Sequence, residues 1–177
     1  MSSRAIFLVG FMGSGKNTVG QELARQLDWA FADLDALIET QERQSIPEIF
    51  RAKGESHFRA AETNALRALT TNLSQNTVGA LGGGAFAQEL NRQLLRPWPT
   101  IFLEAPINEL WQRCLQHETA EGAQRPLRGN RDQFVRLYEE RLPLYRQATL
   151  SVATSGKTPA EICREIGRLL NLDIPTR

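Results

Sequence analysis

The feature that most constrains the fold is the segment GFMGSGKN at residues 10–17, which directly follows the apolar run AIFLV at residues 5–9. A short apolar run that ends at glycine is typical of a buried parallel strand. Gly10, Gly15 and Lys16 match the phosphate-binding loop, in which four residues separate Gly from Gly-Lys. Glycines let backbone N–H groups approach phosphate oxygens, and the following helix directs its positive end at the same anion. The residues expected to contact a nucleotide are Gly13, Ser14, Gly15, Lys16, Asn17 and Thr18. The alternative is a plain glycine-rich turn.

Asn17 stands where this loop normally carries Ser or Thr, whose hydroxyl binds Mg²⁺. An amide oxygen is a hard, neutral ligand that can also coordinate Mg²⁺, but the side chain is bulkier than serine. Thr18 comes one residue late and should point elsewhere on the helix. We expect nucleotide binding to persist with the metal position impaired or rearranged. The alternative is a protein that binds its ligands without catalysis.

Apolar runs alternate with segments of helical periodicity along the whole chain. The expected strands are residues 5–9, 30–35, 76–81, 100–106 and 149–154. The expected helices follow the loop (with Val19, Leu23 and Leu27 inward), occupy 36–70 in pieces, 87–95, 107–117 and 133–145, and begin again at Pro159 (with Ile162, Ile166, Leu169 and Leu170 inward). This order predicts an α/β fold, with a five-stranded parallel sheet covered by helices on both faces. The length of 177 residues suits one domain over 1–177.

Polar and glycine residues follow the expected strands where ligands bind in such sheets, at the carboxyl ends. Asp33 and Asp35 end the second strand, and Gly82–Gly84 end the third. One aspartate could hold Mg²⁺ through water, and the other could accept a hydrogen bond from a substrate hydroxyl. The alternative for Asp35 is a helix N-cap, since it precedes the helical segment ALIE. The convergence of these residues with the phosphate loop predicts a site at this edge.

Three arginines are further candidates. Arg59 could grip a carboxylate with its planar fork, or it could pair with Glu62 on the surface of a helix. Arg125 lies in the polar segment 117–132, which we interpret as a lid, because long polar segments in compact domains are usually functional. Arg141 follows in RLPLYR. Taken singly, each arginine could also be ordinary solvated surface.

Composition excludes several classes of protein. Twenty-one basic and 20 acidic residues give a net charge of +1, which argues against a nucleic-acid surface. The first apolar run is too short for a signal peptide or a membrane span, so we expect a cytoplasmic protein without a membrane partner. The two cysteines and two histidines lack the spacing of a disulfide scaffold or a zinc site. No long apolar patch is evident, which favours a monomer.

Seven motifs occur in one order over nearly the whole chain: GFMGSGK, DLD, FRAAE, GGG, NRQLL, RPL and RLPLYR. In this order they resemble shikimate kinase, a small P-loop kinase of the nucleoside-monophosphate-kinase type. The resemblance implies ATP and Mg²⁺ as cofactors and transfer of the γ-phosphoryl group to the 3-hydroxyl of shikimate, a step of aromatic amino-acid and chorismate biosynthesis. A gluconate kinase is the alternative among related enzymes, which Arg59, Arg141 and the three glycines disfavour together.

The resemblance also implies a role for each candidate residue. Lys16 would be the phosphate-loop lysine, Asn17 and Asp33 would lie at the metal, and Arg125 would be the lid arginine that faces the phosphates. Asp35 would hydrogen-bond substrate hydroxyls and help to remove the proton. The shikimate pocket would comprise Asp35, Arg59, Gly82, Gly83, Gly84 and Arg141, with substrate-binding helices over 34–70. Arg113 would stack on adenine, and TSGKTP at 154–159 would close over it.

Overall fold

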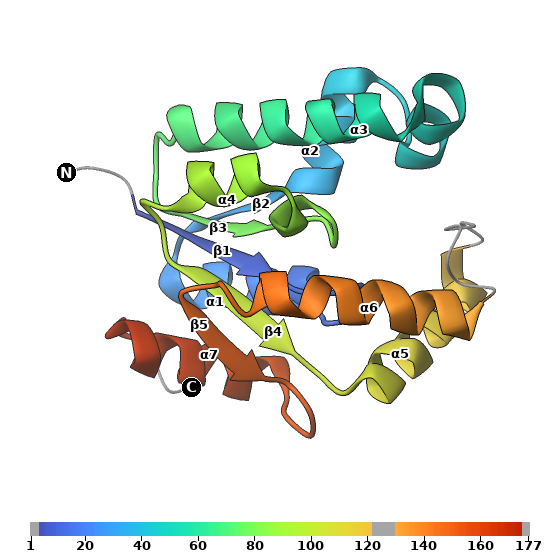
Figure 1. Cartoon of the computed structure of the whole chain (residues 1–177). Coiled ribbons are helices and arrows are strands. Elements are labelled where there is room, and N and C mark those ends of the chain that lie inside the picture. Colours follow the sequence, from blue (N-terminus) through green and yellow to red (C-terminus); the bar gives the residue numbers. More distant parts are fainter. Residues whose placement is uncertain (1–3, 122–129, 175–177) are drawn as a thin grey trace.

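A five-stranded parallel sheet forms the centre of the molecule (Figure 1). The structure is a computed structural model that describes residues 4–121 and 130–174. The strands lie in the order β2-β3-β1-β4-β5. Their bounds are β1 Ala5–Val9, β2 Ala30–Asp33, β3 Thr77–Ala80, β4 Thr100–Glu104 and β5 Leu150–Ala153. All five predicted strands and the predicted α/β class are therefore confirmed. Because β1 lies in the middle, the loop that follows it emerges at the centre of the sheet edge.

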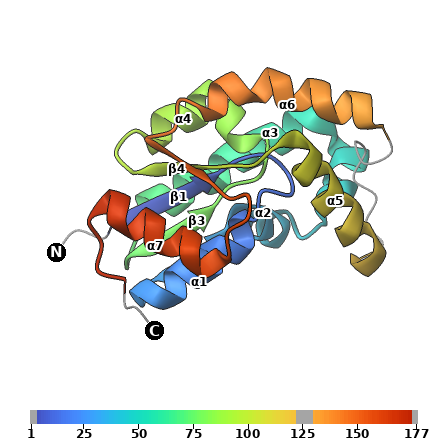
Figure 2. The ribbon, with the colours of Figure 1, turned by 90° about the horizontal axis from the view of Figure 1, so that it is seen from below.

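Helices cover both faces of the sheet. They are α1 Lys16–Leu27, α2 Leu34–Glu42, α3 Ile46–Thr71, the short 3₁₀ helix η1 Ala85–Ala87, α4 Glu89–Leu95, α5 Ile107–Glu121, α6 Arg131–Tyr145 and α7 Pro159–Leu170. Helices α1 and α7 lie side by side on one face, and α3, α4 and α6 lie on the other (Figures 1 and 2). Each face has its own hydrophobic core. In β1, Ile6 and Leu8 face α1 and α7 while Phe7 and Val9 face the opposite core, as strand alternation requires.

The end of α7 differs from the prediction. Ile162 and Ile166 are buried as expected, but Leu169 is 46% exposed. The buried stripe of this helix is centred on Cys163 and Ile166, so Leu169 lies at its edge, one residue before the helix ends. The helical periodicity predicts the position of the buried stripe correctly, but it predicts a stripe that is wider than the one observed.

The boundary between β2 and α2 also differs. The strand ends at Asp33 and not at residue 35, and α2 begins at Leu34. Asp33 is the N-cap, because its Oδ1 accepts a hydrogen bond from the backbone N–H of Asp35 at 2.9 Å. The alternative role of Asp35 as the cap is therefore wrong, and Asp35 belongs to the first helical turn. Further on, Ser45 N-caps α3 before Pro47, and Gly54 interrupts this helix with a φ of 79°.

The segment predicted as a lid over 117–132 is partly helical. Helix α5 continues to Glu121, and α6 already begins at Arg131. The sequence HETAE at 117–121 contains good helix formers such as Glu and Ala. The prediction of a loop for these residues, which relied on their polarity, is therefore wrong. Arg125 lies outside the described residues. Within the described part of the chain, none of the helices combines the length and the apolar character needed to cross a membrane.

Candidate active site

The loop between β1 and α1 has the backbone of an anion site. Gly13 and Gly15 have φ values of 79° and 86°, which favour glycine. A Cβ at Gly13 would lie 2.8 Å from the carbonyl oxygen of Leu110, so the loop also packs too tightly against α5 for a side chain. Gly15 offers no side chain to cap α1, which leaves its first N–H groups directed at the loop. Lys16 Nζ donates to the Phe11 carbonyl at 2.9 Å, which holds the lysine across the loop.

Asn17 and Asp33 meet at the carboxyl edge of the sheet. Asn17 Nδ2 donates to Asp33 Oδ2 at 2.6 Å, while Asp33 Oδ1 accepts from Asp35. A carboxylate accepts hydrogen bonds only, so the amide nitrogen of Asn17 must be the atom that faces Asp33. The two side chains offer a carboxylate and an amide oxygen, which are suitable ligands for Mg²⁺. A cation held between them requires this hydrogen bond to open. Thr18 is exposed on the first turn of α1.

A second group of side chains surrounds the turn Gly82–Gly84 that follows β3. A Cβ at Gly82 would lie 2.5 Å from Asp35 Oδ1, and one at Gly84 would overlap the Arg59 guanidinium. A Cβ at Gly83 would lie 3.8 Å from Arg141 Nη1. The structure thus brings together Asp35 from α2, Arg59 from α3 and Arg141 from α6, the three side chains that the resemblance implies for one pocket. Gly82 and Gly84 are required because Asp35 and Arg59 approach their backbone too closely for a side chain, whereas Gly83 has room for a methyl group.

Glu62 belongs to the same group and was not predicted as a site residue. Its side chain is only 1% exposed and accepts from Arg59 Nη1 at 2.9 Å and from Gln88 Nε2 at 2.7 Å. Burial raises the pKa of Glu62; Arg59 and Arg141 oppose this rise, and Asp35 adds to it. The alternative of an Arg59–Glu62 pair on the surface is wrong in its location, because the pair is anchored in the interior. The spacing in FRAAE indicated the pair, but not its burial.

Tyr145 and Phe11 fix the position of Arg141 and of the glycine turn. Tyr145 is fully buried, stacks on Phe102 at 5.3 Å, and its hydroxyl donates to the Gly83 carbonyl. Burial raises the pKa of Tyr145 to about 12, although Arg141 opposes this shift. The Arg141 guanidinium lies 5.9 Å from the centre of the Phe11 ring, within the range of a cation–π contact. Neither Phe11 nor Tyr145 is predicted as a site residue, because in the sequence each resembles an ordinary residue of the hydrophobic core.

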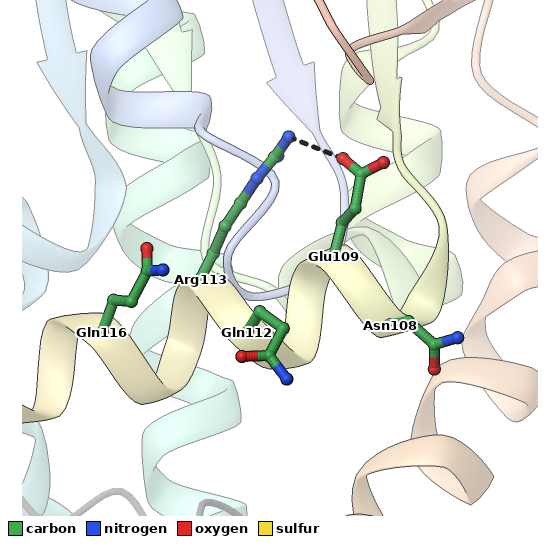
Figure 3. Close-up of a pocket in the computed structure, with 5 residues that line it drawn as sticks. All are labelled: Asn108, Glu109, Gln112, Arg113 and Gln116. Atoms are coloured by element: carbon green, nitrogen blue, oxygen red, sulfur yellow. Dashed lines mark hydrogen bonds and ion pairs between the residues drawn. The ribbon is translucent and has the colours of Figure 1, made fainter.

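Arg113 lies on α5 beside the phosphate loop. Its Nη1 donates to the Gly13 carbonyl at 3.3 Å, and its Nη2 pairs with Glu109 Oε2 at 3.1 Å. Figure 3 shows Arg113 and Glu109 pointing from the same side of α5, away from Gln112. A pocket of about 270 Å³ adjoins this helix, lined by Asn108, Glu109, Gln112, Arg113 and Gln116. Ser155, in the loop predicted to close over adenine, donates to Glu109. Arg113, the predicted adenine contact, therefore lies next to the phosphate loop, and the segment with Ser155 meets the same helix through Glu109.

Comparison with known proteins identifies the family. The family model described as shikimate kinase matches residues 12–171. The chain belongs to the shikimate kinase family. A shikimate kinase from Persephonella marina is 40% identical over 169 residues, which cover 94% of this chain and 99% of that protein. The structure of the Acinetobacter baumannii shikimate kinase in complex with shikimate has a TM-score of 0.85 at 33% identity, covering 96% of this chain and 94% of that one.

A gluconokinase from Sinorhizobium meliloti is similar in fold alone. It is 22% identical, with a TM-score of 0.59, and covers 95% of this chain and 94% of its own. The comparison therefore gives the alternative of a gluconate kinase no support beyond the shared P-loop architecture. Membership of the shikimate kinase family makes the chain a phosphotransferase that uses ATP.

Proposed function

We propose that this chain transfers the γ-phosphoryl group of ATP to the 3-hydroxyl of shikimate, giving shikimate 3-phosphate and ADP. The observation that carries the proposal is the convergence of Asp35, Arg59 and Arg141 on the turn Gly82–Gly84, beside the phosphate loop, in a member of the shikimate kinase family. One chain supplies Asp35, Arg59, Arg141 and the glycine turn, so a monomer is sufficient for this site.

The charges of the site suit a small anion that carries hydroxyl groups. Arg59 and Arg141 would bind the shikimate carboxylate, because guanidinium groups pair with carboxylates through two parallel hydrogen bonds. Asp35 would accept a hydrogen bond from a substrate hydroxyl and assist in removing its proton. Phosphoryl transfer depends mainly on positioning and on neutralising charge, so an ordinary aspartate is sufficient.

The nucleotide would bind along the other side of the site. Backbone N–H groups of Gly13–Lys16 would cradle the phosphates, and Lys16 would neutralise charge on the transferring group. Arg113 would contact adenine, and Arg125 would face the phosphates. We propose that Mg²⁺ accompanies ATP, with Asp33 and Asn17 as the residues that hold it. When bound, the ion neutralises phosphate charge, and the hydrogen bond between the two residues keeps Asp33 oriented beforehand.

The test is release of ADP from ATP and Mg²⁺ with shikimate, beside gluconate and a control without acceptor. ADP release that depends on shikimate is the expected result. Release with gluconate alone would favour the related enzyme. If ATP and shikimate both bind in calorimetry and no ADP is released, the chain is a binding protein that has lost catalysis. Asn17 would then be the first residue to substitute, because it pairs with Asp33 at the proposed Mg²⁺ position.

A further inference from the structure

Arg59 can bind a substrate carboxylate well only if its own position is fixed. Its Nη1 pairs with Glu62 at 2.9 Å, whereas its Nη2 lies 3.3 Å from Glu55, whose side chain is 69% exposed. Exposed pairs of this kind contribute little, because solvent screens them and the side chains remain mobile. Glu62, which is 1% exposed, is therefore the group that fixes the guanidinium.

Glu62 is itself held by Gln88. The Gln88 amide Nε2 donates to Glu62 Oε2 at 2.7 Å, across 26 residues of sequence. This is the same carboxylate oxygen that accepts from Arg59. We infer that Gln88 is a positioning residue for shikimate: its amide orients Glu62, and Glu62 orients Arg59. The inference rests on the proposed function, in which Arg59 binds the shikimate carboxylate.

The backbone on which Gln88 sits is well suited to this role. Gln88 lies between η1 and α4, where its N–H donates to the Ala85 carbonyl at 3.2 Å and its own carbonyl accepts from Arg92 at 3.1 Å. Gln88 comes four residues after Gly84, so residues 82–88 carry both the glycine turn and the amide that donates to Glu62. Movement of this segment would displace both walls of the pocket together.

A neutral donor has a specific advantage at this position. Glu62 is buried beside Asp35, and both its burial and that like charge raise its pKa. A donor to the ionised form lowers the pKa again, without adding positive charge that would compete with Arg59 and Arg141 for a ligand. A lysine would also satisfy Glu62, but it would place a third cation in the pocket.

The experiment compares Gln88→Met with Gln93→Met. The first keeps the length of the side chain and removes the amide; the second removes an exposed amide from α4 that donates to Glu89 at 3.1 Å. Shikimate affinity is measured by calorimetry without ATP, and kinetics are measured separately. We expect Gln88→Met to weaken shikimate binding roughly three- to tenfold, the range of an ordinary hydrogen bond, because the lost bond acts on shikimate only through Glu62 and Arg59. ATP affinity should be unchanged, kcat should stay within about twofold, and Gln93→Met should match the wild type.

A pH series adds a readout that a merely structural role would not change. Without the Gln88 donor, Glu62 takes up its proton at higher pH, so shikimate affinity should fall earlier on acidification than in the wild type. Asp35, Arg59, Arg141 and Tyr145 also face Glu62, and they are the same in both proteins.

Equal shikimate affinity in Gln88→Met and the wild type would overturn the inference, as would an equal loss of shikimate and ATP affinity. Failure to fold would also overturn it, because Gln88 would then be a stability residue. A wild-type chain that does not bind shikimate would instead remove the proposed function.

Discussion

The side chain at position 17 decides how the phosphate loop meets Asp33. Asn17 donates to Asp33 at 2.6 Å, so a cation must displace this hydrogen bond to reach both residues. Serine or threonine at this position places a hydroxyl oxygen on the loop without an amide group in the way. We expect Asn17→Ser and Asn17→Thr to raise kcat or to lower the Mg²⁺ concentration that gives half-maximal activity. The measurement is ADP release titrated with Mg²⁺ at saturating shikimate and ATP.

Asn17→Ala shows whether the Asn17 amide is a ligand of the metal ion or only competes with the ion for Asp33. If the amide only competes for Asp33, its removal should leave the affinity of the ATP-bound protein for Mn²⁺, measured by electron paramagnetic resonance, equal or higher. A lower kcat in both hydroxyl variants would show instead that asparagine is an adapted part of the site.

Lys16 is the one side chain whose charge the phosphate loop presents to a nucleotide. It is held across the loop by the Phe11 carbonyl, so its ammonium group is already positioned before ATP binds. We expect Lys16→Ala to lower turnover by more than about tenfold while shikimate affinity stays at the wild-type value. Turnover and calorimetry on the same preparation test this. Unchanged turnover would remove the phosphate-loop argument.

At the scale of the element, the turn Gly82–Gly84 sets the shape of the pocket. A methyl group at Gly82 would meet Asp35 Oδ1 at 2.5 Å, but at Gly83 its closest neighbour would be the Met12 nitrogen at an ordinary 3.6 Å. We expect Gly82→Ala to lower kcat/KM for shikimate roughly tenfold or more, because a displacement of about 1 Å in a reacting group can cost up to a hundredfold. Gly83→Ala, the matched control, should stay within about twofold. Equal activities in steady-state assays would contradict the packing seen here.

The elements show which parts of the fold sequence could predict. Each strand was found because it is a short apolar run with a clear end, and β2 differed only where Asp33 caps α2. The end of α5 was missed because a polar helix without an apolar stripe resembles a loop. In the site, Arg59 and Arg141 were found through motifs of the family. Glu62, Gln88 and Tyr145 were missed, since their roles depend on burial and on contacts between distant segments.

For the whole molecule, a functional site that buries a carboxylate works against stability. The pKa of Glu62 is raised in the folded chain above the ordinary value of 4.5. The folded state therefore holds this proton more tightly than the unfolded state does. The contribution of Glu62 to the free energy of unfolding is fully present below about pH 4.5 and is lost as pH rises through its raised pKa. The hydrogen bond from Arg92 lowers the pKa of the exposed Glu89. The contribution of Glu89 to the free energy of unfolding therefore has the opposite pH dependence: it is present above pH 4.5 and is lost as the pH falls.

Glu62→Gln tests this opposition between function and stability. The variant removes the titrating group, so its free energy of unfolding relative to the wild type should rise as the pH increases from 4.5 through the raised pKa of Glu62. Shikimate affinity should fall roughly tenfold or more, because Arg59 loses the charge that fixes it. Denaturant unfolding across this pH range measures the first effect, and calorimetry measures the second. Glu89→Gln is the control: above pH 4.5 it should lose stability relative to the wild type, with shikimate affinity unchanged. If both variants show the same pH dependence, burial of Glu62 does not limit the stability of the chain.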